Sequence, residues 1–550
     1  MKRLFVCILL GIFLMTGCGN HTETNLYPST EKTETGDIPM DDDKTTEVAE
    51  KENPVNAEQE EPKDSQVEVL KVNPIQLYKD DITFEEWGDR SVVCSSKRDM
   101  IKIFDDEREK YPRLNNVLEN ISEKTMEQMT LFMNDNVEYA LEEEKNEYFG
   151  GYKDELKLYV QRADDVIVSI RENQYQYTGG AHPMSAFAGI NIDPVTGKIL
   201  TISDVFMDST MLIEVLSEKL IEKYGEDLFY TSPEELLNEY TPEQFSWTVG
   251  YQGITFYFSP YELAPYAAGT QYVTIWFDEA KEWIDEKYMS APKDGYVAEL
   301  PFNEEVHLDL NAETPEKDVL TVGKNFVEET VEVFQMTVSI NEETYFSEEI
   351  FYYGDLKTSL ACVPDQGRNR YYLYAEYTIE STDLYIYELT ENGIKLQGTL
   401  ENVRMPGIVW DQWDSYHQTQ MYMEQILTDP SEFTMTSRMY LMGFMDGMKI
   451  YHADPKDGMP KADADYYILP ENFAVLTLKK DLEIEIFPEN KTEMIKEGTE
   501  FTYLRTDNET YMDFRMDDGR ECRVYFEEKD WEKTINGFLP EECFEGIPNV

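Results

Sequence analysis

The longest periodic pattern of apolar positions lies between Tyr111 and Tyr148. Its apolar side chains recur three or four residues apart, and they include Leu118, Ile121, Met126, Met129, Leu131, Met133 and Val137. This spacing is typical of one face of a helix. The segment therefore predicts a long amphipathic helix packed on a core. Shorter helices are expected over 209–224 and over 232–240, the second with Ser232 as its cap and Pro233 in its first turn.

Segments of alternating polarity surround these helices and predict strands. Residues 81–104 indicate an early strand pair, and 157–177 alternate in the same way. A short strand is expected within 198–206, before the helix that follows. Residues 253–277 predict two strands on either side of an aromatic loop broken by prolines. Helices and strands together indicate one α+β domain over residues 69–290.

The second half of the chain is predicted to be largely β. Residues 370–400 indicate three strands, with one turn at 381–383 and a hairpin turn at Asn392-Gly393. Helical interruptions are expected at 414–429 and 431–445. From residue 469 onward, five short alternating segments and a tight turn at Asp518-Gly519 indicate a small SH3-like barrel. The predicted architecture is thus an α+β domain, a β-rich domain over 291–468, and an SH3-like β-barrel over 469–550.

The first residues have the layout of a secretory signal. Lys2 and Arg3 precede an apolar run that ends at Cys18, and this run is too short to span a bilayer comfortably. The run resembles the lipobox of bacterial lipoproteins, in which the cysteine is acylated, although Met15 stands where leucine is usual. We expect a signal peptide over 1–18 and lipidation of Cys18. The alternative is an ordinary cleaved signal with an incidental cysteine.

Residues 19–68 are predicted to form a disordered acidic linker. Between Gly19 and Gln66 there are 14 Asp or Glu against four Lys, and Tyr27 is the only aromatic residue. So few apolar side chains cannot offset the entropy lost on folding. The linker is expected to hold the folded part away from the cell membrane, on its extracytoplasmic face, while a lipid anchor provides the contact with the membrane.

The formal net charge of −63 limits the classes of partner. Such a surface argues against binding nucleic acid or anionic lipid through a basic patch. It would attract a cationic partner, and the alternative explanation of the charge is solubility.

The chain shows few signs of catalytic or metal chemistry. Cys94, Cys362, Cys522 and Cys543 form no CxxC pair. Cys522 and Cys543 could form a disulfide in an oxidising compartment, or they could be buried thiols. Sequence motifs of nucleotide binding, zinc proteases and serine hydrolases are absent. We expect no metal, no cofactor and no catalytic residue.

The segment from 177 to 200 contains the most distinctive residues. Gly179 and Gly180 permit positive φ or close backbone approach, and His182 precedes a proline that favours extended backbone. Asp193 begins a turn between two strands. Three roles remain open for His182: a structural histidine in a tight turn, part of a binding surface, or a catalyst. The catalytic role is the weakest, because no activated Ser or Cys motif accompanies it.

Four segments together resemble a known family. Residues 177–183, 191–206, 253–269 and 272–277 are similar to the extracytoplasmic domain shared by the anti-sigma factor RsiV and the peptidoglycan deacetylase PdaC. That domain is called domain of unknown function 3298 and usually follows a companion, 4163. The resemblance covers roughly residues 70–290. It transfers the positions Gly179, Gly180, His182, Asp193, Thr196, Gly197, Ser259, Pro260, Tyr261, Pro265, Tyr266 and Gly269.

The resemblance implies a binding module rather than a catalyst. In RsiV-like proteins the domain binds lysozyme, and in PdaC-like enzymes it accompanies a separate deacetylase domain that we do not find in this sequence. The leading hypothesis is therefore a non-enzymatic envelope protein that binds a lysozyme-like cationic protein. A second hypothesis is binding of peptidoglycan or another wall polymer, with Tyr257, Tyr261 and Tyr266 stacked on sugars. A third is an enzyme with an unrecognised site.

Overall fold

The computed structural model describes residues 72–548 except 147, 312–316, 329–332, 353, 380–381, 405–406, 411–412, 415–416, 419–420, 440, 443–444, 470–473 and 530–531. The predicted signal peptide, Cys18 and the linker over 19–68 lie outside these residues. Lys71–Val550 form one compact unit. Within the described residues, no helix has both the length and the apolar composition needed to cross a bilayer.

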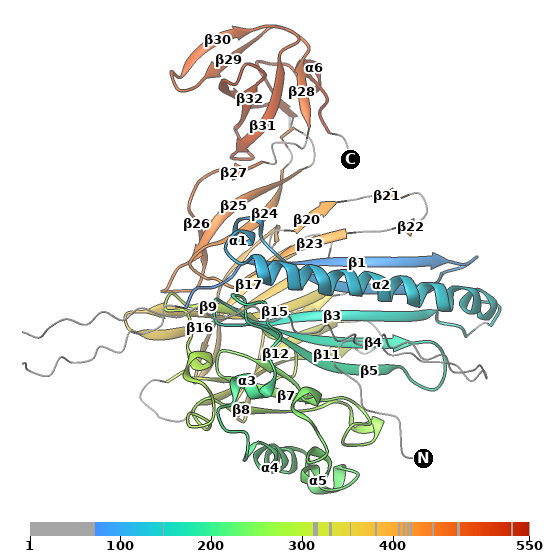
Figure 1. The fold of residues 1–550 in the computed structure, drawn as a ribbon. Helices are drawn as coiled ribbons and strands as arrows, with labels where there is room; N and C mark the ends of the chain where they lie inside the picture. The colour runs from blue at the N-terminus through green and yellow to red at the C-terminus, as the bar shows by residue number, and fades with distance from the viewer. Residues whose placement is uncertain are drawn as a thin grey trace, which may run out of the picture. The chain divides into compact units, whose positions relative to one another are not determined.

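A seven-stranded sheet contains the first strands of the described chain (Figure 1). Its strands, in spatial order, are β20 (Gly407–Trp410), β23 (Met421–Ile426), β1 (Leu77–Trp87), β2 (Val92–Ile103), β3 (Tyr152–Ala163), β4 (Val168–Tyr177) and β5 (Met184–Ile192). β2 and β3 run parallel, and the helix between them makes the required crossover. The other neighbouring strands of this sheet are antiparallel.

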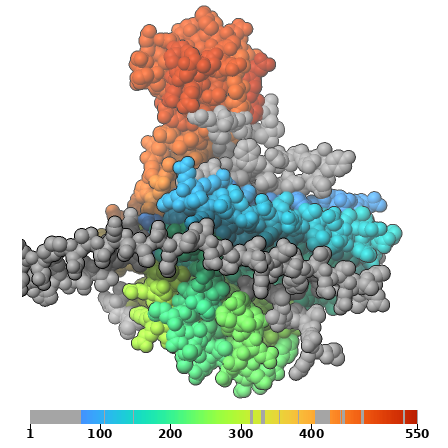
Figure 2. Space-filling model, viewed as in Figure 1, coloured from blue at the N-terminus to red at the C-terminus, as the bar shows by residue number. Residues whose placement is uncertain are grey.

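That helix, α2 (Pro112–Glu143), confirms the long amphipathic helix and follows the short α1 (Asp105–Arg108). It lies along one face of the sheet, and its atoms form a continuous blue-to-cyan surface with the neighbouring strands (Figures 1 and 2). Leu114, Leu118 and Met129 are buried on the sheet side. Leu131, which the sequence assigned to the same stripe, is 53% exposed because it lies off the face formed by the buried residues.

A second, three-stranded sheet and several helices share another core. The strands are β6 (Ser246–Val249), β7 (Gly253–Phe258) and β8 (Gln271–Trp276), and the helical elements are α3 (Ile202–Val205), α4 (Leu212–Tyr224), α5 (Pro233–Leu237), η1 (Glu226–Leu228), η2 (Pro242–Gln244), η3 (Tyr266–Ala268) and η4 (Glu286–Met289). α4 and α5 confirm the two shorter helices. Ser232 precedes α5, but its side chain makes no capping hydrogen bond.

The prediction of a short strand within residues 198–206 is wrong. The β structure there consists of two isolated bridges, Ile192 with Ile199 and Phe206 with Ile284, and α3 lies between them. The reason is a capping box, in which the Thr201 backbone N–H donates to Asp204 Oδ2 at 2.9 Å. The sequence stretch therefore begins a helical turn where alternation suggested a strand.

The prediction of helices at 414–429 and 431–445 is also wrong. The described residues there form β21 (Trp413–Asp414), β22 (His417–Gln418), β23 and β24 (Phe433–Met439). β23 pairs with β1 in an antiparallel ladder that joins Leu77 to Ile426 and Ile82 to Met421. Met, Glu and Gln favour helices locally, but a free sheet edge far away in the sequence overrides that preference.

Two five-stranded sheets occupy most of residues 296–400. One contains β9 (Tyr296–Glu299), β15 (Asp355–Asp365), β16 (Arg368–Thr378), β17 (Thr382–Thr390) and β18 (Gly393–Leu400). The other contains β10 (Val306–Leu308), β11 (Asp318–Glu328), β12 (Val333–Ile340), β13 (Glu343–Phe346) and β14 (Phe351–Tyr352). β16, β17 and β18 confirm the three strands predicted over 370–400, and Gly393 has the positive φ of 122° that its turn requires.

The C-terminal strands join a twelve-stranded sheet. Besides β24 it contains β19 (Val403–Arg404), β25 (Met445–Ala453), β26 (Pro460–Ala462), β27 (Tyr467–Ile468), β28 (Val475–Leu478), β29 (Leu482–Ile486), β30 (Lys491–Ile495), β31 (Glu500–Thr506), β32 (Tyr511–Met516), β33 (Glu521–Tyr525) and β36 (Phe544–Glu545). A hairpin of β34 (Glu527–Lys529) and β35 (Glu532–Thr534) and the short α6 (Pro540–Cys543) complete the elements. Most of the core under β28–β33 comes from residues 469–547.

The four cysteines of the described chain are free and buried. Cys522 and Cys543 belong to the same core and form no disulfide. Burial raises the pKa of Cys94, Cys362 and Cys522 to about 12, so these side chains are neutral thiols at ordinary pH. The buried-thiol alternative is therefore the one the structure shows.

Candidate functional site

The turn between β4 and β5 places His182 at the end of a hairpin. Gly179 and Gly180 have φ values of +88° and +100°, which favour glycine. The Tyr177 hydroxyl donates to the Gly180 carbonyl at 3.2 Å and closes the turn. The paired glycines let the chain reverse sharply, so that His182 lies just before the start of β5.

The loop between β7 and β8, residues 259–270, is anchored by hydrogen bonds and by buried side chains. The backbone N–H of Phe187 on β5 donates to Ser259 Oγ at 3.0 Å. The Ser259 N–H donates to Glu262 Oε2 at 2.7 Å, and the Tyr240 hydroxyl donates to Glu262 Oε1 at 2.6 Å. Burial raises the pKa of the Glu262 carboxyl, and the hydrogen bonds from Tyr240 and Ser259 oppose this rise. Leu263 and Ala264 are fully buried, so the middle of the loop is fixed, while Tyr261 is exposed and Tyr266 is half-buried.

His182 meets two tyrosines of this loop. Its ring stacks on Tyr266 with centroids 3.8 Å apart, and Nε2 lies 3.2 Å from the Tyr261 hydroxyl. Nδ1 lies 2.9 Å from the Pro183 carbonyl, which can only accept, so Nδ1 carries the proton. In the neutral ring, Nε2 therefore accepts from the Tyr261 hydroxyl. We call His182, Tyr261 and Tyr266 the aromatic cluster.

Tyr261 holds an unusual backbone conformation. Its φ is +73°, a value that a tyrosine adopts at an energetic cost, and its side chain is 37% exposed. The Tyr261 N–H donates to the Ala264 carbonyl at 3.1 Å, within the anchored loop. A strained, exposed aromatic residue held by a fixed loop is a candidate contact for a ligand.

The other predicted residues are not part of the aromatic cluster, and the contacts of Asp193 and Gly197 stabilise the local backbone. Asp193 Oδ1 accepts from the N–H groups of Val195 and Thr196 at 3.0 and 2.9 Å, and its carbonyl accepts from Gly197. Gly197 has a φ of +70° and packs against the Arg113 backbone of α2. The Asp193 turn thus fixes the chain between β5 and α3. Pro260, Pro265 and Gly269 belong to the anchored loop, and Cys18 lies outside the described residues.

Tyr257 is only 1% exposed, so it cannot stack on a sugar at the surface as the wall-polymer hypothesis required. Its hydroxyl lies 3.0 Å from Thr248 Oγ1, and its ring stacks near Phe187. The buried guanidinium of Arg171 lies 5.8 Å from both rings and pairs with Glu304. This arrangement supports β5 and β7 beneath the aromatic cluster.

The sequence reasoning missed Glu262, Tyr240 and Arg171. A signal for Glu262 was present, because Ser259 and Glu262 have the spacing of a capping box. Nothing in the sequence links Tyr240 or Arg171 to the loop, since their partners are brought together only by folding. Among the described residues, no group of three or more His, Cys, Asp or Glu side chains is arranged to hold a metal ion.

Comparisons with known proteins support the family resemblance. Residues 106–185 match the family model described as "Deacetylase PdaC", and residues 203–278 match the model described as "Protein of unknown function (DUF3298)". The two models together cover both sides of the aromatic cluster: His182 falls in the first and the 259–270 loop in the second. No curated protein matches the chain.

Two crystal structures of DUF3298 family proteins are similar to part of the chain. One, from Bacteroides fragilis, is 20% identical and covers 39% of this chain and 94% of its own, with a TM-score of 0.30. The other, from Pseudomonas aeruginosa, is 18% identical and covers 40% of this chain and 98% of its own, with a TM-score of 0.29. The two family models match residues 106–185 and 203–278, and the chain contains much additional sequence outside these regions.

Proposed function

We propose that this chain is a cell-envelope binding protein that recognises a strongly basic protein, with lysozyme as the candidate partner, through the aromatic cluster. Acylation of Cys18 would anchor it to the outer face of the cell membrane, and the acidic linker would hold it away from the lipid. The resemblance to RsiV-like domains motivates the choice of lysozyme. The net charge of −63 supports a cationic partner, because opposite charges speed association and favour the correct orientation.

The observation that carries the proposal is the strained and anchored position of Tyr261. The loop offers the faces of Tyr261 and Tyr266, beside His182, without further ordering of the backbone. Preorganised aromatic residues make effective contacts because little conformational entropy is lost on binding. Their π faces also attract lysine and arginine side chains.

The test is calorimetry of the purified full chain with lysozyme at low and high ionic strength. We expect binding that weakens as salt rises, since exposed charges are screened. Tyr261→Ala and Tyr266→Ala should each weaken binding about ten-fold or more, as truncation of a central aromatic contact does. The control Tyr139→Ala, at a tyrosine that is 64% exposed on α2, should bind as the parent does.

Two results would count against the proposal in different ways. Undetectable binding at low ionic strength would remove lysozyme as the partner. Binding that ignores salt would remove the electrostatic reason, while leaving the aromatic contacts to be tested by the variants.

A second candidate function is binding of peptidoglycan or another wall polymer. Tyr261 and Tyr266 offer rings on which sugars could stack, and the family model over 106–185 bears the name of a deacetylase. Sedimentation with purified peptidoglycan separates this candidate from the first. An enzyme with an unrecognised site would instead show activity on peptidoglycan fragments that is lost in His182→Ala while the fold is retained.

Two further parts of the proposal have their own tests. If Cys18 is the anchor, Cys18→Ser should move the protein from the membrane fraction to the soluble fraction, and continued membrane retention would contradict it. We also propose that residues 469–550 form an SH3-like barrel, which the antiparallel order of β31, β32, β33, β29 and β30 supports. An experimental structure of that region would decide whether its strands close as a barrel.

A further inference from the structure

A pocket that shares no residue with the aromatic cluster lies where the seven-stranded sheet approaches the sheet of β9 and β15–β18. It has about 490 Å³ of empty volume, part of it open to solvent. Its lining residues come from β1, β9, β15, β16, β17 and the end of β23, and they are Lys79, Glu299, Lys357, Thr358, Ser359, Tyr374, Glu376, Leu384, Ile426 and Leu427. Most of these side chains are polar or charged, and the apolar ones are Leu384, Ile426 and Leu427.

One wall of the pocket is a fixed ion pair. Lys79 Nζ lies 2.9 Å from Glu299 Oε1, and the backbone N–H of Val160 donates to Glu299 Oε2 at 2.7 Å. Both side chains are largely buried. Because Glu299 is held by two partners, this wall is rigid before any ligand arrives.

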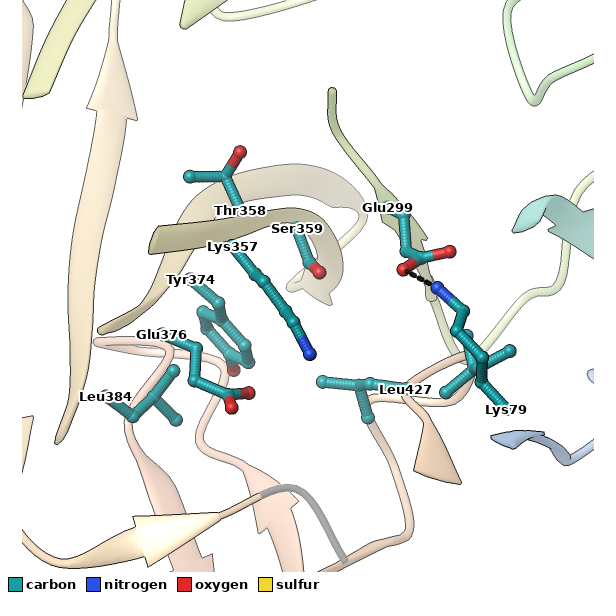
Figure 3. A pocket seen from close by; sticks show the side chains of 10 residues that line it. Lys79, Glu299, Lys357, Thr358, Ser359, Tyr374, Glu376, Leu384 and Leu427 are labelled. Carbon is teal, nitrogen blue, oxygen red and sulfur yellow. Dashed lines mark hydrogen bonds and ion pairs between the residues drawn. The ribbon is translucent and has the colours of Figure 1, made fainter. Parts of the chain in front are cut away.

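The opposite wall carries a second pair of opposite charges. Lys357 and Glu376 lie directly across from one another in the ladder between β15 and β16. In Figure 3 the side chain of Lys357 points into the space beside Ser359, Glu376 and Leu427. Lys357 is exposed and Glu376 is half-buried, so this pair lies where a ligand can reach it from solvent.

The balance of charges limits what the pocket can bind. Two ammonium groups and two carboxylates sum to zero, so a ligand with a large net charge of either sign would lose its hydration without gaining a net attraction in return. An uncharged apolar ligand would remove water from these groups without replacing its hydrogen bonds. A small molecule with one carboxylate and one ammonium avoids both costs, because it places each of its charges next to an opposite one.

We infer that this pocket binds a free amino acid. Lys357 receives the ligand carboxylate, Glu376 receives its ammonium group, and the Ser359 hydroxyl adds a hydrogen bond. Leu384 and Leu427 contact a small side chain. The inference is independent of the aromatic cluster and of the basic partner proposed above.

Titration calorimetry of the full chain tests this inference with alanine, in both enantiomers, as the probe. We expect saturable binding of one alanine per chain for at least one enantiomer. Propionate and ethylamine, which each keep one of the two charges, should bind at least about ten-fold more weakly. Lys357→Met and Glu376→Gln should each weaken alanine binding by a similar factor, because each removes one of the two ion pairs with the ligand.

The matched control is Lys395→Met. Lys395 is also exposed and also lies opposite a glutamate, Glu388, in a neighbouring ladder of the same sheet, but it does not line the pocket. It should leave binding unchanged. Unchanged melting temperatures show that the variants are folded, and Ser359→Ala, which removes only a hydroxyl, provides a milder second variant. Absence of alanine binding, equal binding of propionate, or parental affinity in both charge variants would overturn the inference.

Discussion

The seven-stranded sheet and the C-terminal sheet differ in how far apart in the sequence their paired strands lie. β1 has β2 on one side, but its other neighbour is β23, whose residues come from a distant part of the sequence. In the C-terminal sheet, β29, β30, β31, β32 and β33 pair among themselves within residues 482–525. The first sheet therefore depends on the rest of the chain, whereas the second is built mainly from local contacts, which form with less loss of chain entropy.

Both sheets also bury an aspartate, and the difference between the two is instructive. Asp154 accepts from Arg98 Nε at 2.8 Å and from Ser96 Oγ at 2.7 Å, and all three side chains are buried. Asp513 is equally buried, but its partners Arg505 and Arg523 retain 35% and 23% of their side-chain exposure. Loss of the carboxylate should thus cost more in the first sheet, where the arginine left behind cannot regain water.

The largest expected difference concerns truncation. A fragment of residues 72–290 lacks β20 and β23 and leaves the edge of β1 unpaired, so it should not unfold cooperatively and should tend to aggregate. A fragment of residues 474–548 should fold and melt cooperatively. Circular dichroism melts and size-exclusion chromatography of both fragments measure this. Cooperative, monomeric behaviour of the first fragment would remove the contrast.

Next in size is Asp154→Ala. It leaves the Arg98 guanidinium buried without its carboxylate, which should lower the free energy of unfolding by about 3–5 kcal/mol. Urea denaturation of the full chain, followed by a probe of the first sheet such as tryptophan fluorescence, gives the value. A loss below about 1 kcal/mol, as for an exposed pair, would show that Arg98 finds water or another partner.

Asp513→Ala should have a smaller effect. Arg505 and Arg523 are partly exposed and can be rehydrated, although they would then lie near each other without the shared carboxylate. We expect a loss of about 1.5–3 kcal/mol, typical of hydrogen bonds to a charged group. The same urea experiment on the C-terminal fragment provides the measurement. A loss as large as that of Asp154→Ala would mean that the partial exposure of Arg505 and Arg523 does not reduce the cost of removing their carboxylate.

The last contrast is a difference in pH dependence. Burial raises the pKa of Asp99 on β2 to about 6, against the opposing effects of the Lys79 ammonium and the Leu158 N–H. Between about pH 4, the unfolded value, and pH 6 the folded state holds a proton that the unfolded state has released. Asp99 therefore makes the fold less stable as pH rises through this window, and Asp99→Asn should remove that slope.

Asp507 in the C-terminal sheet behaves in the opposite way. Burial would raise its pKa, but hydrogen bonds from the Thr510 hydroxyl and from three backbone N–H groups lower it overall. Its contribution to stability is present above its unfolded pKa and is lost as pH falls. Urea midpoints of the full chain and of the C-terminal fragment between about pH 3 and 7 test the contrast. Parallel pH profiles, or an unchanged slope in Asp99→Asn, would contradict it.

Much of the fold could be predicted where local pattern and final structure agree. The spacing around Leu118 and Met129 gave α2, and Asn392-Gly393 gave the β17–β18 turn. The strand β23 could not be predicted, because its residues favour helices locally and its pairing with β1 depends on a partner far away in the sequence. The capped turn at Thr201 shows the reverse, a local hydrogen bond that a pattern of alternating polarity does not reveal.

The candidate site could be predicted only in part. The resemblance brought Gly179, Gly180, His182, Tyr261 and Tyr266 into view, and the structure places the last three in contact. Burial of Tyr257 was not predictable, because β7 is covered on both faces and alternation then gives no guide.

The direction of the hydrogen bond between Tyr261 and His182 has a consequence for selectivity. Because the phenol gives its only proton to Nε2 of the imidazole, the Tyr261 oxygen has lone pairs, and no hydrogen, to offer an incoming molecule. A guanidinium or ammonium group can donate a hydrogen bond to that oxygen, whereas a carboxylate finds no donor there. If the cluster binds a basic protein as proposed, we expect it to prefer lysine and arginine side chains to carboxylates at this oxygen.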